Sequence, residues 1–283
     1  MMSQPFPLDS LRSLAVTGPE ARDFLQNQLS SDVYEVSGRH GQLSGWHDPK
    51  GRVLAFLRVL PWQDGFLLVM HAGLASTVEQ RLRMYILRAK VVLHQGPHVY
   101  GLNPGRAARW LSAEGLEPPD EPLGAACKDS VSVLRMAGQA GLLLAGDLAG
   151  VPDEAAVEAW ELAELEAGIP EVYPETSGQF VAQMLNLDRI GAVSFTKGCY
   201  PGQEIVARAH HLGRVKRRAR LFRAAGAPPA AGDALADSGG TVVRAAAAGG
   251  DCLVMAVVAE DAAGPFTLAD GRLLEHKPPA DAT

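Results

Sequence analysis

Two turn sequences between apolar runs constrain the fold of this chain more than any other feature. Within residues 42–70, the segments Asp48-Pro49-Lys50-Gly51 and Gln63-Asp64-Gly65 separate stretches rich in Leu, Val and Phe. Asp, Pro and Gly at these spacings favour tight reversals, and strands joined by tight reversals pair antiparallel. The chain also lacks a strand–GxGxxG–helix unit, so a dinucleotide site of the Rossmann type is not expected. The sequence therefore predicts antiparallel sheets.

Three segments carry the signals of helices. Thr17 and Glu20 have the spacing of a capping box, which predicts a helix that runs to Leu29. Apolar residues at helical spacing predict a second helix over 77–87. A third helix is expected over 153–167, because a glycine and a proline follow it as stop signals.

Short apolar segments predict strands along the rest of the chain. In the first 213 residues these segments lie at 14–16, 91–93, 99–102, 131–136 and 142–145. Farther on, stretches rich in Ala, Gly and Pro separate strands at 220–222, 241–244 and 252–259, a pattern typical of a small β-barrel. We therefore expect an α+β protein, with a body at residues 1–213 and a C-terminal β-barrel domain at residues 214–283.

Composition and cysteine usage limit the class of protein. The net charge of −6 gives no support for a protein that coats nucleic acid along its whole surface. Cys127, Cys199 and Cys252 are far apart, without a CxxC pair or a histidine at metal spacing. This argues against a zinc site or a disulfide framework and favours a reducing compartment. The amino terminus shows no secretory leader, and no apolar stretch reaches the ~18 residues of a membrane helix. We expect a cytoplasmic protein with no membrane span and no metal site.

The segment 196–204, Thr-Lys-Gly-Cys-Tyr-Pro-Gly-Gln-Glu, is dense in residues that carry chemistry. Gly198 and Gly202 let the backbone turn or approach a ligand closely. Because a short helix is expected over 203–209, Cys199 would precede a helix amino terminus and lie two residues from Lys197. Both influences favour the thiolate, which makes these two residues catalytic candidates. The alternative is a small buried cysteine in a tight loop.

The run that ends in Lys197-Gly-Cys-Tyr-Pro-Gly-Gln-Glu204 resembles the signature of the YgfZ-type folate-binding proteins, which are related to the glycine-cleavage T-protein, an aminomethyltransferase. The resemblance spans roughly residues 10–215 and is weaker beyond them. Other segments that fit the same family in the same order are Phe24-Leu-Gln-Asn-Gln-Leu-Ser-Ser-Asp-Val33, Asp48-Pro-Lys-Gly-Arg52, Glu166-Ala-Gly-Ile-Pro170 and Ser177-Gly-Gln-Phe180.

The resemblance implies that residues 1–213 form a T-protein-like folate-binding body of two intertwined subdomains. In this family three subdomains form a ring around a channel that binds tetrahydrofolate. T-protein engages the folate through an aspartate in the strand after its Asp-x-Lys-Gly turn. Aligning that turn on Asp48 puts Ala55 and Phe56 where T-protein has acids, and neither can accept a proton. The chain is therefore expected to be a folate-binding accessory factor for iron–sulfur cluster assembly or repair, including in tRNA-modifying enzymes. The alternative is an active folate-dependent aminomethyl or one-carbon transferase, so enzymatic activity stays open.

The resemblance also supplies candidate contacts to folate. Glu166 matches the glutamate that contacts the pterin in T-protein, and a carboxylate can accept two hydrogen bonds from the pterin edge. Otherwise Glu166 is one more acid on a solvated helix face, beside Glu161 and Glu164. Tyr173 lies where T-protein offers an aromatic residue, or it serves packing alone. The remaining candidates for the cofactor site are Gln183, Gly198, Tyr200, Gly202, Glu204 and Arg208.

Two features bear on partners. Cys199 would act as a nucleophile, as a redox-sensitive thiol or as a transient ligand of cluster iron, and one thiolate cannot hold a cluster without a partner. The partners expected are folate and iron–sulfur enzymes or their assembly proteins. Residues 208–220 concentrate positive charge, which suits folate's glutamate tail, RNA phosphates or plain solvation. Without interleaved aromatic residues, direct RNA binding is not expected. His210 and His211 are adjacent in sequence, poor spacing for a metal.

Overall fold

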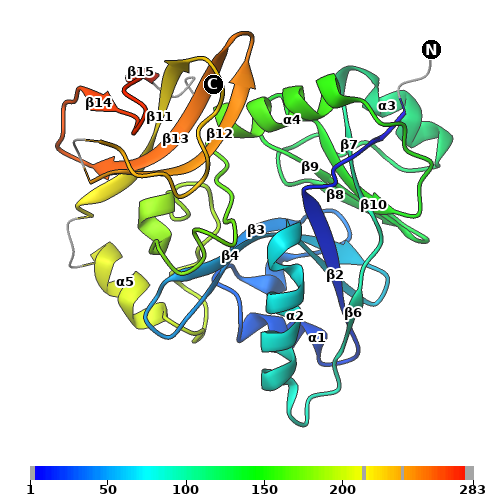
Figure 1. Cartoon of the computed structure of the whole chain (residues 1–283). Helices are drawn as coiled ribbons and strands as arrows, with labels where there is room; N and C mark the ends of the chain where they lie inside the picture. Colours follow the sequence, from blue (N-terminus) through cyan, green and yellow to red (C-terminus); the bar gives the residue numbers. More distant parts are fainter. Residues whose placement is uncertain (1–3, 212–214, 237–238, 278–283) are drawn as a thin grey trace.

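Three antiparallel sheets of five strands each make up the framework of the chain (Figure 1). The structure is a computed structural model that describes residues 4–211, 215–236 and 239–277. Helices pack against the sheets, and every pairing between named strands in the described part of the chain is antiparallel. The predicted α+β class with antiparallel sheets is confirmed.

The first sheet contains both predicted hairpins. Its strand order is β3-β4-β5-β2-β6, with β2 (Leu11–Thr17), β3 (Gln42–His47), β4 (Val53–Trp62), β5 (Gly65–His71) and β6 (Val92–Gln95). In the β3–β4 turn, Asp48 Oδ1 accepts hydrogen bonds from the backbone N–H groups of Lys50 and Arg52, which is how an aspartate stabilises a reversal. The helical elements of this region are α1 (Ala21–Gln26), η1 (Val33–Glu35) and α2 (Ala72–Ile86).

The predicted capping box at the start of α1 is wrong. Glu20 occupies the N-cap position, but no side chain caps the helix. The Glu20 carboxylate instead accepts a hydrogen bond from the backbone N–H of Lys90, so this side chain makes a tertiary contact and does not cap the helix. The helix also ends at Gln26, before Leu29, because Leu29 forms a β-bridge with Trp46.

The second sheet has the order β1-β7-β10-β9-β8. It contains the predicted strands at 99–102, 131–136 and 142–145, and two short strands at its edges that the sequence pattern did not indicate. The strands are β1 (Phe6–Pro7), β7 (Val99–Leu102), β8 (Ala125–Lys128), β9 (Val131–Arg135) and β10 (Leu142–Gly146), with helices α3 (Pro104–Ala113) and α4 (Glu154–Glu166). Asp153 caps α4 by accepting from the N–H of Ala156 at 3.0 Å, so the predicted third helix is confirmed.

The third sheet lies in the C-terminal region and curls into a half-barrel, as the sequence predicted (Figure 1). Its order is β12-β13-β11-β15-β14, with β11 (Arg217–Ala225), β12 (Thr241–Ala248), β13 (Asp251–Ala259), β14 (Phe266–Thr267) and β15 (Leu273–Lys277). A separate apolar cluster that includes Phe222, Val254 and Phe266 fills its inner face. The predicted boundary at 213/214 falls outside the described residues, so the division into domains stays a prediction.

The long segment between α4 and β11 is mostly irregular, as its glycines, prolines and polar residues indicated. It contains the 3₁₀ helix η2 (Ala182–Leu185) and the helix α5 (Gln203–His211), which matches the helix expected over 203–209. Within the described ranges, no helix is both long and apolar enough to cross a membrane.

Candidate functional site

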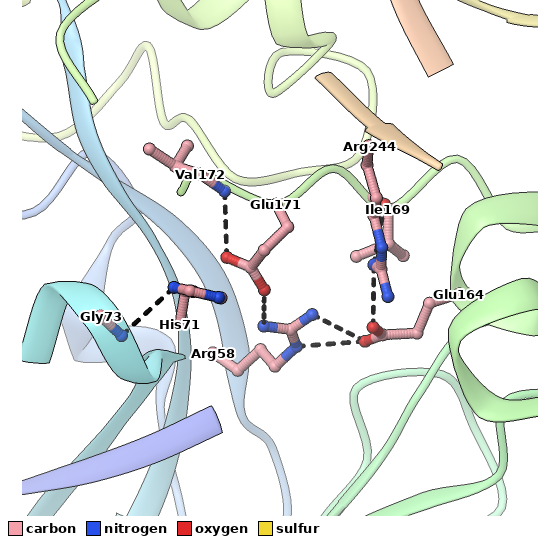
Figure 2. A network of polar contacts seen from close by, with 8 residues as sticks. All are labelled: Arg58, His71, Gly73, Glu164, Ile169, Glu171, Val172 and Arg244. Atoms are coloured by element: carbon pink, nitrogen blue, oxygen red, sulfur yellow. Dashed lines mark hydrogen bonds and ion pairs between the residues drawn. The ribbon is translucent and has the colours of Figure 1, made fainter. Parts of the chain in front are cut away.

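A buried network of charges joins the first sheet, helix α4 and the third sheet (Figure 2). Arg58 on β4 of the first sheet is fully buried, and its guanidinium binds Glu164 of α4 at 2.7 Å and Glu171 at 2.9 Å. Arg244 on β12 of the third sheet binds the other oxygen of Glu164 at 3.0 Å and donates to the carbonyl of Ile169 at 3.4 Å. Each carboxylate and guanidinium therefore has a partner of opposite charge, which a buried charge requires.

The network fixes the charge state of its members. Burial by itself would raise the pKa of Glu164, but the guanidinium groups of Arg58 and Arg244 outweigh it and lower that pKa. Burial would likewise lower the pKa of Arg58, but Glu164 and Glu171 outweigh it and raise that pKa. Glu164, Arg58 and Arg244 are thus ionised at neutral pH. The expectation that Glu164 lies on a solvated helix face is wrong, because Glu164 follows the buried Trp160 by one helical turn.

Tyr173 and Glu161 lie beside this network. The Tyr173 ring packs against His71 with ring centroids 4.7 Å apart, and burial raises the pKa of Tyr173 to about 12, which Arg244 opposes. Burial also raises the pKa of Glu161, an effect that Arg244 opposes. Among the residues that the structure describes, the Glu161 side chain has no hydrogen-bond or ion-pair partner. A half-buried acid and an aromatic ring thus lie within electrostatic reach of each other, next to the charge network.

The signature loop, defined here as residues 194–204, is held by the side chain of Lys197. The Lys197 Nζ donates to the carbonyl oxygens of Gln26, Leu29 and Ser31 at 2.7, 2.8 and 2.8 Å. All three donors of the ammonium are therefore directed at the end of α1 and the chain that follows it. Burial lowers the pKa of Lys197 to about 8, and Asp32 opposes this. The geometry makes Lys197 an anchor of the loop.

Two glycines pack the signature loop against the β3–β4 turn. Gly202 has a φ of +79° and Gly51 a φ of +73°. A Cβ atom added at Gly202 would lie 2.5 Å from the carbonyl oxygen of Asp48 and 2.7 Å from the Cα atom of Gly51. Only glycine permits both the backbone conformation and the close approach. The two sequence segments singled out for their resemblance are therefore in direct contact.

Within the loop, the buried ring of Tyr200 lies near Lys197 and His47. Its ring is 5.4 Å from the Lys197 Nζ and 5.9 Å from the ring of His47, and burial raises its pKa to about 12. His47 is buried at the end of β3, and burial lowers its pKa to about 4, which Asp48 opposes. Neither ring nitrogen of His47 has a hydrogen-bond partner in the described part of the molecule. His47 is a polar group beneath the loop that sequence reasoning missed, although its place before Asp48-Pro49 was visible.

Cys199 is exposed at the surface, so the alternative of a buried cysteine is wrong. Gly198 beside it meets no atom within 4 Å of an added Cβ, so this stretch of the loop faces open space. Glu204 and Arg208 follow on α5 and pair with each other at 2.8 Å on an exposed helix face. The thiol is accessible to a partner molecule.

The remaining folate candidates do not converge with Tyr173. Gln183 is buried and donates to the carbonyl of Val206 at 2.7 Å. Glu166 forms an exposed ion pair with Lys277 at 2.6 Å, and both line a hollow of about 440 Å³ between α4 and the third sheet. At 100° per residue, Glu166 lies roughly opposite Glu164 on α4 and so faces away from the charge network.

The positions aligned with the T-protein acids are apolar and inaccessible. Ala55 and Phe56 on β4 are fully buried, and the Phe56 ring lies 5.2 Å from the Arg58 guanidinium. Three described cations of the stretch 208–220 are bound internally. Arg218 pairs with Asp188 at 2.9 Å, while Arg217 and Arg220 donate to backbone carbonyls. Residues 212–214 of this stretch fall outside the described residues. No group of three His, Cys, Asp or Glu side chains suited to a metal ion is found in the described ranges.

Comparison with known proteins places the chain in a family. It is 30% identical over 227 residues to the tRNA-modifying protein YgfZ of Edwardsiella ictaluri, which covers 74% of this chain and 68% of that protein. The chain belongs to the YgfZ family. It is 31% identical over 226 residues to the YgfZ protein of Klebsiella pneumoniae, and 26% identical over 274 residues to that of Colwellia psychrerythraea, which covers 90% of this chain and 85% of that protein. No protein-family model matches the sequence.

A solved structure supports the same relationship at the level of the fold. The aminomethyltransferase T of the glycine cleavage system from Bartonella henselae superposes with a TM-score of 0.73 at 18% identity, over 98% of this chain and 86% of that one. The resemblance to YgfZ proteins and to the T-protein that the signature predicted is therefore confirmed. At this identity the T-protein structure establishes the fold alone.

Proposed function

We propose that this YgfZ-family chain is a tetrahydrofolate-binding accessory factor that supports iron–sulfur cluster assembly or repair, including in tRNA-modifying enzymes. Two lines support a role of this kind. Relatives that match most of the chain are named tRNA-modifying proteins, and the fold is that of a folate-associated enzyme family. The complete Lys197–Glu204 signature supports the proposal that this loop has the same functional role in the chain as in the rest of the family.

The observation that carries the folate proposal is the half-buried Glu161 near Tyr173, where α4 lies between the first and third sheets. A pterin needs a carboxylate to accept from its amino and ring N–H groups, and it gains from contact with an aromatic face. Glu161 has no competing partner in the described chain, and its raised pKa reflects a half-buried carboxylate that a donor would stabilise. These residues fit a pterin. Glu166 stays a candidate from resemblance, on the opposite side of α4.

The apolar residues Ala55 and Phe56 on β4 favour the accessory role over one-carbon transfer. Transfer of a one-carbon unit between nitrogen atoms needs a group that accepts or donates a proton at the reacting nitrogen. Ala55 and Phe56 offer no such group and are shielded from any ligand. When bound, tetrahydrofolate would supply a one-carbon carrier or a reductant, while the chain's own residues would hold its pterin.

The signature loop is the part that we assign to the client. Cys199 presents a thiol at the surface, and Lys197 and Gly202 hold the loop that bears it. A single thiolate can bind cluster iron only together with ligands from another molecule, so a partner protein or glutathione completes the site.

A complementation experiment tests the accessory role. In cells that lack the protein, a Cys199→Ala variant should fail to restore the activity of an iron–sulfur tRNA-modifying enzyme, whereas Cys127→Ala should restore it. Cys127 is the matched control because it is a second free cysteine that lies outside the loop. Full rescue by Cys199→Ala would overturn the role of the thiol. Absence of tetrahydrofolate binding to the wild-type chain would overturn the folate part.

A further inference from the structure

Four large apolar side chains are exposed within nine consecutive residues at the end of α2 and the start of β6. The exposed fractions are 66% for Met84, 48% for Tyr85, 90% for Leu87 and 56% for Val92. Single exposed apolar residues are ordinary, but a group of them commonly marks an interaction surface. Figure 1 shows that the turn after α2 projects from the first sheet, on the side away from the third sheet.

The backbone displays these side chains instead of burying them. The inner face of α2 packs on the sheet through Leu74, Val78 and Leu82, so the last turn of the helix directs Met84 and Tyr85 outward. Leu87, the C-cap residue, has a φ of +42°, a backbone conformation that is strained for a bulky side chain. A glycine at this position would relieve the backbone strain. The presence of leucine instead is consistent with a use for its exposed side chain.

A hollow of about 330 Å³ lies beside the exposed group, between α1 and the end of α2. Phe24, Tyr85 and Ala89 give it apolar walls. Gln28 also lines it, is more than nine-tenths buried, and has a side-chain oxygen without a hydrogen-bond partner in the described structure. The hollow can thus take an apolar side chain next to a donor that would satisfy Gln28.

The chain segment that bears the exposed group is basic, although the chain is acidic as a whole and Glu20 and Asp23 line the adjoining hollow. Residues 80–113 contain no Asp or Glu, whereas the net charge of the chain is −6. Arg81, Arg88 and Lys90 are exposed, and their side chains have no ion-pair partner in the described ranges. Arg83 alone among these cations is neutralised, by Glu79 at 2.6 Å. Charge complementarity therefore favours an acidic partner.

We propose that Met84, Tyr85, Leu87, Val92 and the adjoining hollow form a docking surface for an acidic amphipathic segment of a partner protein. An apolar side chain of the segment fills the hollow, and its Asp and Glu residues meet Arg81, Arg88 and Lys90. Three aliphatic side chains gain little from phosphates and bases, which disfavours RNA. Because the carboxylates of Glu20 and Asp23 line the hollow, the apolar side chain of the segment lies there and its Asp and Glu residues lie on the cationic side of the surface.

The docking surface shares an element with the signature loop. Phe24 and Gln28 face the hollow from α1 and the residues after it, and the carbonyls of Gln26 and Leu29 in the same stretch bind Lys197. A segment docked in the hollow therefore lies against the stretch that anchors the loop bearing Cys199. The surface does not depend on folate binding, so either proposal can fail without the other.

Site-specific photocrosslinking tests the surface. The full chain carries a benzophenone side chain at position 87, or at position 273 as the control, because Leu273 is also exposed but lies on the third sheet. After irradiation in cells, crosslinked peptides are sequenced. We expect position 87 to capture a recurring protein segment rich in Asp, Glu and apolar residues, which position 273 does not capture. Crosslinks to RNA or lipid, to segments without acidic residues, or no excess over position 273 would overturn the proposal.

Binding of a synthetic peptide with the captured sequence to the purified chain completes the test. The double variants M84S/L87S and R88E/K90E should each weaken its affinity about tenfold or more, because the first removes apolar contact area and the second reverses the charges that meet the acidic segment. L273S and K216E, which change exposed residues elsewhere, should leave the affinity unchanged. Equal losses in all four variants would overturn the proposal. So would binding to total tRNA, or to phosphatidylglycerol–phosphatidylcholine vesicles, that only R88E/K90E weakens.

Discussion

Replacement of Lys197 by Met separates an anchoring role from a catalytic one. The variant keeps most of the side-chain volume but removes three N–H donors from the carbonyls of Gln26, Leu29 and Ser31. A hydrogen bond to a charged group contributes about 1.5–3 kcal/mol, and burial of the ammonium offsets part of the total. We therefore expect Lys197→Met to lower the free energy of unfolding by about 3 kcal/mol.

Urea denaturation measures this loss, and hydrogen exchange locates it. Amide protection should fall in the signature loop and in the stretch after α1, because the two segments lose their common contact. Lys216→Met is the control, since Lys216 is exposed and lacks a side-chain partner in the described chain. If Lys197→Met abolishes function in cells while stability and loop protection stay at the wild-type level, the anchor interpretation is refuted.

Three further changes test the parts around the site. Arg58→Met should lower the free energy of unfolding by about 3–5 kcal/mol, because it leaves the Glu164 carboxylate buried beside one cation instead of two. A loss of under about 1 kcal/mol in urea denaturation would contradict the network. Gly202→Ala should cost about 2–4 kcal/mol and Gly198→Ala within about 0.5, since an added Cβ is crowded only at Gly202; equal losses would contradict the packing. The pKa of His47 is about 4 in the fold and 6.5 in the unfolded chain, so the unfolded state alone binds the proton between these values. Wild-type stability should thus fall by about 3 kcal/mol more than that of His47→Leu between pH 7 and 4, and parallel pH profiles would contradict this.

Local patterns predicted much of the framework. The β3–β4 and β4–β5 hairpins followed from turn chemistry, and α4 followed from its cap and its stop signals. The edge strands β1 and β14 were not predicted, because each has only two residues and so shows no periodicity. Local patterns also could not predict that each sheet has five strands, because strand pairing depends on contacts between distant segments.

The site was harder to predict because its key contacts join distant segments. Lys197 meets carbonyls that lie 166 to 171 positions away in the sequence, so its spacing to Cys199 suggested chemistry where the structure shows an anchor. Arg58 offered a signal, since it is the single charge in an apolar strand of ten residues. A lone charge in such a run indicates a buried partner, and helical spacing from Trp160 would have selected Glu164.

Resemblance and geometry point to different acids on α4. Alignment with the family selects Glu166, whereas helical periodicity places Glu161 on the side of Arg244 and Tyr173. The two choices predict opposite results in the same assay, which makes the position of the pterin decidable.

Calorimetric titration with tetrahydrofolate tests the central claim most directly. The wild-type chain should bind with saturable heat at one site. Glu161→Gln should weaken the affinity about tenfold or more, because a neutral amide accepts weaker hydrogen bonds than a carboxylate. Glu166→Ala should bind as the wild type does. Absence of heat with the wild-type chain would contradict folate binding, and weakening by Glu166→Ala alone would contradict a pterin site beside Tyr173.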